Sequence, residues 1–220
     1  MRGDEEPNAI SFTFDDGPDH RTTPQILDAL DARGVKGAFF INGAKIHPRT
    51  AGGPENQAVL RDIYRRGHFI GNHTFTHKDI TTLDEDGWKL EVLQVEQVVR
   101  SITGRRPYLF RPPFAKTTPQ TISRLVAEGY TVVMWNLETQ DWLAKTPDEL
   151  VARVARLIEE NPAGGVLVMH DTSPVTAEAL PRIIEWIDER NGGLAARGKP
   201  PLEIVGIEHF VRNAKPAKAP

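Results

Sequence analysis

Residues 9–34 read AISFTFDDGPDHRTTPQILDALDARG and contain one complete strand–helix unit. The run AISFTF is apolar and β-prone, whereas TPQILDALDARG has the apolar spacing of an amphipathic helix that a glycine ends. Between the two, Asp15 and Asp16 stand side by side at the strand end, and the following Gly-Pro pair turns the chain. Adjacent carboxylates repel each other, so their position needs a chemical reason.

The same alternation of strand and helix continues along the chain. Further strands are predicted at 37–41, 68–71, 108–111, 131–135, 164–170 and 202–207. Further helices are predicted at 55–67, 84–104, 118–129, 146–161 and 177–189. This pattern favours an α/β fold in one domain, a distorted (β/α) barrel with about seven parallel strands. The alternative is an open doubly wound sheet, whose G-x-G-x-x-G fingerprint is absent after the first strand.

The two ends of the chain differ in composition from the predicted domain at 9–212. We expect a terminal extension at 1–8 and a disordered tail or linker at 213–220, since RNAKPAKAP is rich in Ala, Lys and Pro. No apolar run reaches the length of a membrane span, and the charged start MRGDEEPN has no signal-peptide core. The sequence therefore predicts no membrane span, and either a cytoplasmic chain or one without its leader.

Composition excludes several classes of function. The formal net charge of −3 gives no basic field for nucleic acid or anionic lipid, so a neutral or weakly charged ligand fits better. The chain has no cysteine, so any metal must be held by histidine and carboxylate. We expect a monomer.

The unusual polar residues follow the predicted strands. In parallel α/β folds the carboxyl ends of the strands form one face, which carries the active site. We therefore expect these side chains to converge: Asp15, Asp16, His73, His77, Arg111, Asp141, Trp142, His170 and Asp171.

His73 and His77 indicate a metal site. They lie four residues apart, a spacing that one helical turn would place on one face within reach of a single ion. Such a pair also arises by chance on helix surfaces, so the hypothesis needs a third ligand. Either Asp15 or Asp16 can supply it, and the other carboxylate can then receive a proton.

Four other residues suggest how protons and a sugar ring are handled. Arg111, in FRPPF, can grip a carboxylate in bidentate fashion and keep it ionised. Asp141 near His170 would raise the pKa of the imidazole and make it a general acid. Trp142 offers a flat apolar wall that suits a sugar ring. The alternatives are a surface arginine, a structural histidine and a core tryptophan.

Five segments in this order resemble the NodB-homology polysaccharide deacetylases, carbohydrate esterase family four. They are TFDDGP, HTFTH, RPPF, ETQDW and VMH, and they span most of the chain. The resemblance implies a distorted (β/α) barrel with one divalent metal ion, zinc or cobalt, held by Asp16, His73 and His77. It also implies that Asp15 is the general base and that Arg111 orients it.

The same resemblance implies the remaining roles. His170 would be the general acid, tuned by Asp141. The backbone N–H of Phe114 would stabilise the oxyanion, and Trp142 would line the substrate groove. Val168 replaces the usual leucine of Leu-x-His, which alters only the acetate pocket.

Two more departures from the family pattern stand beside these residues. Glu138 stands where the fourth motif usually begins with Asp, so a contact made by that Asp is lengthened or redirected. Phe114 and Ala115 replace the more frequent Tyr-Gly, which removes a hydroxyl but keeps the backbone N–H.

The implied function is hydrolysis of the acetamide of N-acetylglucosamine units in peptidoglycan or chitin-type chains, with release of acetate. An O-deacetylase of acetylated xylan and an amidohydrolase of a small non-sugar amide are alternatives on the same scaffold. A carbohydrate-binding pseudoenzyme is a further alternative, against which the intact base and acid count. An acetylated wall polymer as partner implies an extracellular or cell-envelope location.

Overall fold

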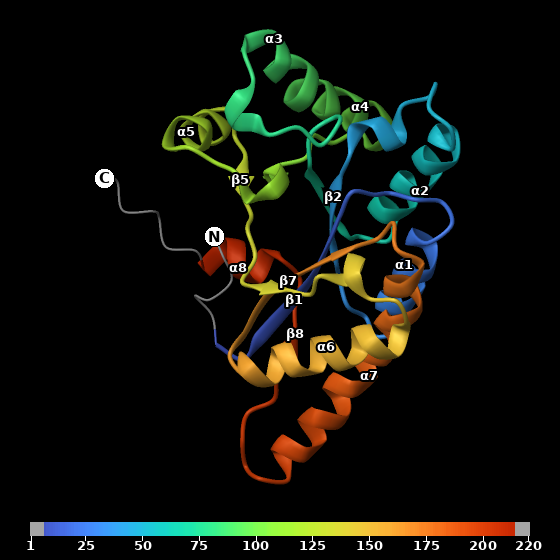
Figure 1. The fold of residues 1–220 in the computed structure, drawn as a ribbon, viewed down its shortest axis with the longest axis vertical. Helices are drawn as coiled ribbons and strands as arrows, with labels where there is room; N and C mark the ends of the chain where they lie inside the picture. Colours follow the sequence, from blue (N-terminus) through green and yellow to red (C-terminus); the bar gives the residue numbers. More distant parts are fainter. Residues whose placement is uncertain (1–6, 214–220) are drawn as a thin grey trace.

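A computed structural model describes residues 7–213, and one parallel sheet forms the centre of the molecule (Figure 1). The strands are β1 (Ala9–Asp15), β2 (Ala38–Ile41), β3 (Phe69–Asn72), β4 (Leu109–Phe110), β5 (Thr131–Val132), β6 (Leu137–Glu138), β7 (Gly164–His170) and β8 (Glu203–Ile204). The terminal segments expected at 1–8 and 213–220 lie almost wholly outside the described residues.

The sheet has the order β5-β4-β3-β2-β1-β7-β6, with β8 paired to β1 off this path. Every strand pair is parallel, and β1 runs beside β7 from Ala9↔Gly164 to Asp15↔His170. The predicted distorted (β/α) barrel in a single domain is thus confirmed. Within residues 7–213 the barrel does not close by a strand pair, since β5 and β6 are its two ends. Residues 133–136 cross this gap.

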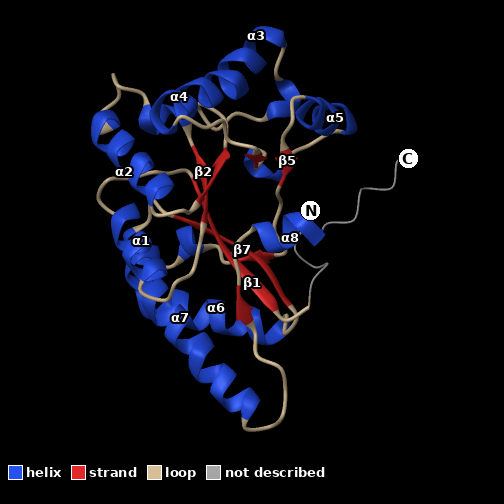
Figure 2. Ribbon diagram, turned by 180° about the vertical axis from the view of Figure 1, so that it is seen from behind, coloured by secondary structure: helices blue, strands red, loops and turns tan. Residues whose placement is uncertain are grey.

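Helices surround the strands, as Figure 2 shows from the opposite side. They are α1 (Thr23–Asp31), α2 (Gly53–Arg65), α3 (Glu85–Trp88), α4 (Gln94–Thr103), α5 (Pro119–Ala127), α6 (Pro147–Glu160), α7 (Pro174–Ala195) and α8 (Glu208–Asn213). Short helical turns are η1 (Gly43–Ile46), η2 (Ile80–Thr82), the π-helical η3 (Lys89–Leu93), η4 (Pro113–Ala115) and η5 (Asp141–Leu143). None of the helices in residues 7–213 has both the length and the apolar character of a membrane span.

Several helices begin with the same local signal. Thr118, Thr146 and Ser173 each accept a hydrogen bond from a backbone N–H of the first turn, and proline follows each of them. The hydroxyl satisfies a donor that the helix leaves free, and proline has no N–H to lose at this position. These caps fix where α5, α6 and α7 leave the strand ends.

Successive residues of the strands enter different parts of the core. Phe39 and Ile41 pack with the large cluster between the sheet and the helices, whereas Ala38 and Phe40 belong to a smaller cluster. Because side chains alternate along a strand, a short apolar run supplies both sides of the sheet. This explains why the buried strands read as continuous apolar runs rather than as alternating patterns.

The structure differs from the sequence prediction in several elements. The helix expected at 84–104 is interrupted by the π-helical turn η3, which periodicity does not reveal. The strands expected at 131–135 and 202–207 contract to two residues each. The predictions missed β6 and α8, because each is too short to leave a periodic pattern. Asp141 and Trp142 consequently follow β6 and not the strand at 131–135.

Candidate active site

Asp15 and Asp16 separate because the backbone turns between them. Asp15 is the last residue of β1, and its buried Oδ1 accepts a hydrogen bond from Arg111 Nη1 at 2.8 Å. Asp16 has a φ of 71°, in the left-handed region that aspartate tolerates better than most residues. The two neighbouring carboxylates therefore differ in their contacts, since Asp15 pairs with Arg111 whereas Asp16 faces His77.

The glycine after this pair is required by a tertiary contact. A Cβ on Gly17 would lie 2.1 Å from both carboxylate oxygens of Asp171. Asp171 is buried and accepts a hydrogen bond from Thr23 Oγ1 at 2.6 Å. Burial raises the pKa of this carboxyl to about 7. Sequence reasoning noticed Asp171 but assigned it no role.

His73 and His77 meet through a loop. The premise of a single helical turn was wrong, because the chain after β3 is irregular and both Thr74 (φ 64°) and His77 (φ 60°) are left-handed. The ring centroids of the two histidines are 4.9 Å apart. The convergence inferred from their spacing is nevertheless present, since the loop folds back on itself.

Glu91 holds this loop, and sequence reasoning missed it. Its fully buried carboxylate accepts hydrogen bonds from the Thr76 N–H at 2.7 Å and the Thr76 Oγ1 at 2.6 Å. It stands in η3, so the π-helical turn is one support of the His77 loop. A glutamate within a charged helix pattern gives no signal of this role.

Asp16, His73 and His77 could hold a metal ion, since one ligand atom of each lies within 4.8 Å of the others. Asp16 Oδ1 is 3.7 Å from His73 Nε2 and 3.5 Å from His77 Nε2. This oxygen is buried and has no hydrogen-bond partner among the described residues. His73 Nδ1 lies 2.7 Å from the Arg111 carbonyl, which leaves Nε2 free for a ligand, and burial lowers the pKa of His73. The residues fit a divalent cation.

Arg111 is fully buried beneath the site. The bidentate grip expected from the sequence is absent, because Nη1 donates to both Asp15 Oδ1 and Thr13 Oγ1 at 2.8 Å, while Nε donates to the Val133 carbonyl at 3.2 Å. The guanidinium also stacks over the Phe40 ring. Its donors are divided between two residues of β1 and the segment at 133–136 that crosses the gap in the barrel. Arg111 therefore joins these two parts of the chain.

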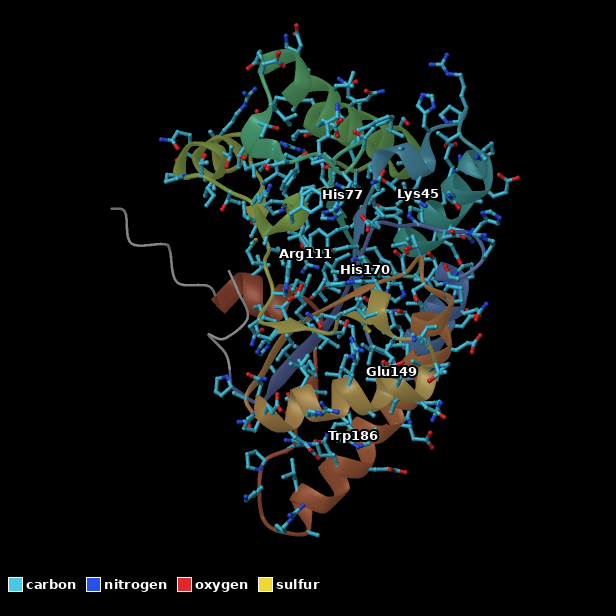
Figure 3. All side chains as sticks on the ribbon, in the orientation of Figure 1. Lys45, His77, Arg111, Glu149, His170 and Trp186 are labelled. Carbon is cyan, nitrogen blue, oxygen red and sulfur yellow. The ribbon has the colours of Figure 1, made fainter. Side chains whose placement is uncertain are left out.

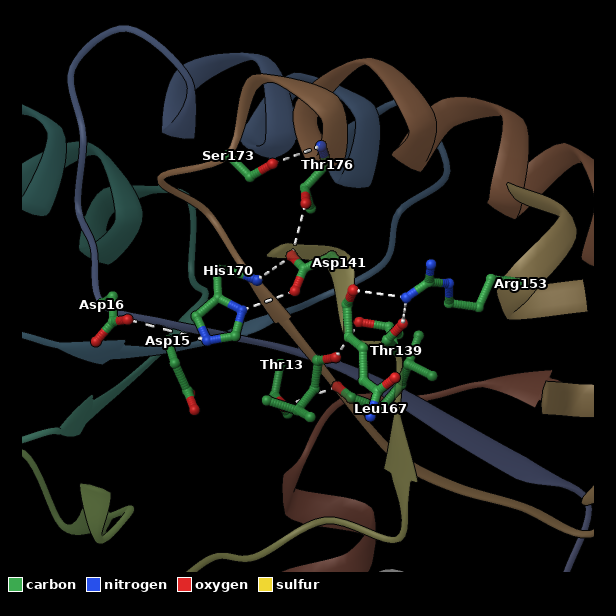
Figure 4. A network of polar contacts seen from close by, with 12 residues as sticks. Thr13, Asp15, Asp16, Thr139, Asp141, Arg153, Leu167, His170, Ser173 and Thr176 are labelled. Carbon is green, nitrogen blue, oxygen red and sulfur yellow. Dashed lines mark hydrogen bonds and ion pairs between the residues drawn. The ribbon is translucent and has the colours of Figure 1, made fainter. Parts of the chain in front are cut away.

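His170 and Asp141 form the second charged pair of the site (Figure 4). Asp141 Oδ1 lies 2.7 Å from His170 Nδ1, and Oδ2 accepts from the His170 N–H and the Thr176 hydroxyl, both at 2.7 Å. Burial alone would lower the pKa of His170. The hydrogen bond and charge of Asp141, with the charges of Asp15 and Asp16, outweigh burial and raise the pKa to about 9.

Asp15, Asp16, His73, His77 and His170 line one cavity of about 700 Å³. Figure 3 shows His77, Arg111 and His170, from three separate segments, gathered at the centre of the molecule. Phe114 and Trp142 are 61% and 54% exposed at the cavity, so their rings are open to a ligand. Buried Val168 also lines it. Of the residues expected to converge at the site, Arg111, Asp141 and Asp171 are buried and do not line this cavity, whereas the others do.

Comparison with known proteins agrees with this arrangement. The family model for polysaccharide deacetylases matches residues 2–133, which is more than half of the chain. The chain belongs to this family. The structural resemblance extends further, since a solved "T48 deacetylase with substrate" has a TM-score of 0.76 and 28% sequence identity, with 97% of this chain and 96% of that chain covered.

Two curated relatives of this family member differ in the polymer that they are named for. A chitin deacetylase of Pestalotiopsis sp is 32% identical over 90% of this chain and 63% of its own length. A peptidoglycan-N-acetylglucosamine deacetylase of Bacillus cereus is 29% identical over 74% of this chain and 56% of its own length. The chain thus spans less than two thirds of either relative.

Proposed function

We propose that this chain is a metal-dependent hydrolase that removes acetyl groups from N-acetylglucosamine units of a polysaccharide. One observation carries the proposal: a carboxylate held by an arginine and an imidazole held by a carboxylate line the same cavity as an Asp-His-His cluster. Amide hydrolysis needs a base for water and an acid for the leaving nitrogen. A site with both beside a metal cluster supports hydrolysis better than binding alone.

Asp16, His73 and His77 are the proposed metal ligands, with zinc favoured and cobalt the alternative. When bound, such an ion polarises the acetyl carbonyl and lowers the pKa of an attacking water. The neutral form of His73, which its lowered pKa favours, is the form that binds a cation.

Asp15 is the proposed general base. Arg111 fixes the orientation of its carboxylate, because one guanidinium nitrogen contacts both Asp15 and Thr13. Asp15 takes a proton from water as the water oxygen bonds to the acetyl carbon. The Phe114 N–H is the proposed donor to the oxyanion that develops, a kind of interaction worth about 3 kcal/mol.

His170 is the proposed general acid. Asp141 keeps the proton on Nδ1 and leaves Nε2 directed to the cavity, so Nε2 can protonate the leaving nitrogen as the carbon–nitrogen bond breaks. The products are acetate and an amino sugar. Trp142 and Phe114 are the proposed walls for the sugar rings, since exposed flat rings suit their apolar faces. A wall polymer as substrate supports a location outside the cell or in its envelope.

Acetate release tests the proposal. Metal-stripped protein is incubated with N-acetylglucosamine oligomers or with acetylated xylan, with and without zinc or cobalt. We expect metal-dependent release from the oligomers and a loss of about 100-fold or more with Asp15→Asn, which removes the base but keeps the side-chain shape.

Each other outcome assigns a different function. Release from xylan alone would favour the O-deacetylase alternative. No release from either polymer with any metal would contradict the proposal and favour a small-amide hydrolase or a binding protein. The presence of Asp15 and His170 counts against the carbohydrate-binding pseudoenzyme, because binding alone needs neither a base nor an acid.

A further inference from the structure

Glu138 places an acidic side chain in the wall of the active-site cavity. In the two-residue strand β6, Leu137 is buried and Glu138 is exposed. The register pairs Glu138 with Val168 of β7, and both line the cavity together with Trp142 and His170. The carboxylate of Glu138 therefore borders the space that a substrate would fill.

The charge of Glu138 is not compensated. Asp15, by contrast, is paired with Arg111 at 2.8 Å, and Asp16 faces His73 and His77. For residues 7–213 no hydrogen bond or ion pair engages the Glu138 carboxylate, and no lysine or arginine among them lines the cavity. The imidazole of His170, which also lines it, is paired with Asp141 at 2.7 Å.

Two cations follow this strand along the chain, Lys145 and Arg153, and among the described residues neither is paired with Glu138. Arg153 donates hydrogen bonds to the Gln140 carbonyl at 2.8 Å and to the Glu149 carboxylate at 3.1 Å. Its guanidinium is thus held by α6 and the loop after β6. Glu138 remains the free negative charge of this wall.

An uncompensated carboxylate favours a cation at its side and disfavours an anion. The walls beside it include Trp135 and Trp142, whose low polarity strengthens a charge interaction relative to open water. The proposed reaction itself produces an organic cation. Removal of the acetyl group leaves an amine, which takes up a proton and becomes an ammonium group. Each turnover would therefore create the group that Glu138 attracts.

We propose that Glu138 is a specificity-determining residue that favours chains with a free amino sugar beside the acetylated unit, and disfavours chains with a carboxylate there. This inference rests on the proposed deacetylase function and names its preferred substrate class, a partly deacetylated amino-sugar chain. Deacetylation along one chain would then proceed in runs of neighbouring units.

The test compares two oligomers of equal length, one fully acetylated and one with a single glucosamine beside an acetylated unit. The quantity measured is the ratio of their kcat/KM values for acetate release, at a pH where the amine is protonated. Glu138→Gln removes the charge and keeps the size of the side chain. Glu160→Gln, at the exposed end of α6, makes the same charge change away from the cavity.

We expect the wild type to prefer the glucosamine-containing oligomer, and Glu138→Gln to lower the ratio by up to about fivefold, the size of an exposed ion pair. The preference should weaken as salt is added, since screening shortens the reach of the charge. Glu160→Gln should keep the wild-type ratio. Equal ratios in wild type and Glu138→Gln would overturn the inference.

A second measurement separates this inference from the proposed function. The dissociation constants of both oligomers are measured by calorimetry for the same three proteins, without turnover. If no acetate is released from either oligomer, the proposed function fails, while the ratio of dissociation constants still tests Glu138. An unchanged binding ratio in Glu138→Gln would count against the role of its charge.

Discussion

Asp141 shows at the scale of one residue how a carboxylate can set the orientation and the pKa of an imidazole. Its two oxygens receive three groups, namely the His170 ring Nδ1, the His170 backbone N–H and the Thr176 hydroxyl. An asparagine at this position would offer only one oxygen acceptor. At least one of the three donors would then face the NH₂ group of the amide, which cannot accept a hydrogen bond. Asp141 is thus a positioning residue whose charge and shape both matter.

Asp141→Asn should lower kcat by about 100-fold, because His170 would no longer be held in the protonated form and orientation that a general acid needs. KM should change little, because the residues that line the cavity stay the same. The loss of charge also lowers the pKa of His170. Steady-state kinetics on an N-acetylglucosamine oligomer give both constants. Asp148→Asn, which removes an exposed carboxylate that pairs with Arg182, is the matched control. A rise in KM with an unchanged kcat would assign Asp141 to substrate binding instead.

The loop after β1 shows how an element depends on another part of the chain. Gly17 follows the two catalytic candidates, and its Cα faces the carboxylate of Asp171, which lies just past β7. The sequence suggested a turn glycine. The structure gives a different reason, since space and not φ excludes a side chain here.

Gly17→Ala should destabilise the protein by about 1–3 kcal/mol, because the new methyl group would overlap a buried carboxylate. The displaced loop carries Asp16, so the zinc affinity should fall as well. Urea unfolding and zinc competition measure these two effects. The control is Gly192→Ala in α7, where nothing lies within 4 Å, and we expect it to stabilise the protein by about 0.5–1 kcal/mol. Equal stability of Gly17→Ala and wild type would contradict the packing argument.

At the scale of the whole molecule, His68 links folding to pH. Its side chain is buried, its Nδ1 accepts the Gly37 N–H at 3.1 Å, and its Nε2 has no hydrogen-bond partner among the described residues. Burial lowers the pKa of His68 from 6.5 to about 4, although Asp31, 3.5 Å from Nε2, opposes the shift. The unfolded chain therefore binds this proton at a higher pH than the folded protein does.

The sign of the pH effect follows from that difference. Between pH 6.5 and about 4 the unfolded state takes up the proton first, so the contribution of His68 to stability is lost as the pH falls. The total loss is about 3 kcal/mol. Urea unfolding across this range should show the stability of His68→Gln approaching that of the wild type as the pH is lowered.

Glutamine keeps an acceptor for Gly37 but does not titrate, so the comparison isolates the imidazole. His209→Gln, in α8, is the matched control, and its stability should keep a constant difference from the wild type. A constant difference for His68→Gln as well would show that the buried imidazole is not the linked group.

The sequence by itself determined the repeating β/α pattern and the ends of the strands beside Asp15, His73 and His170. Apolar runs interrupted by helix signals leave few alternatives to a parallel sheet, and parallel strands place their carboxyl ends on one face. For this reason residues as distant as Asp15, His73 and His170 could be assigned to one site. The five short segments added the family, and the fold and family were both confirmed.

Tertiary structure alone decided how the side chains divide their contacts. The left-handed turn at Asp16, the folded loop of His77 and the split donors of Arg111 all depend on partners far along the chain, which local periodicity cannot encode. The same holds for Glu91 and Asp171, buried carboxylates that brace the two loops of the candidate metal site. Their roles could not be predicted from the sequence, because the partners of each carboxylate lie in other segments and come close only in the folded chain.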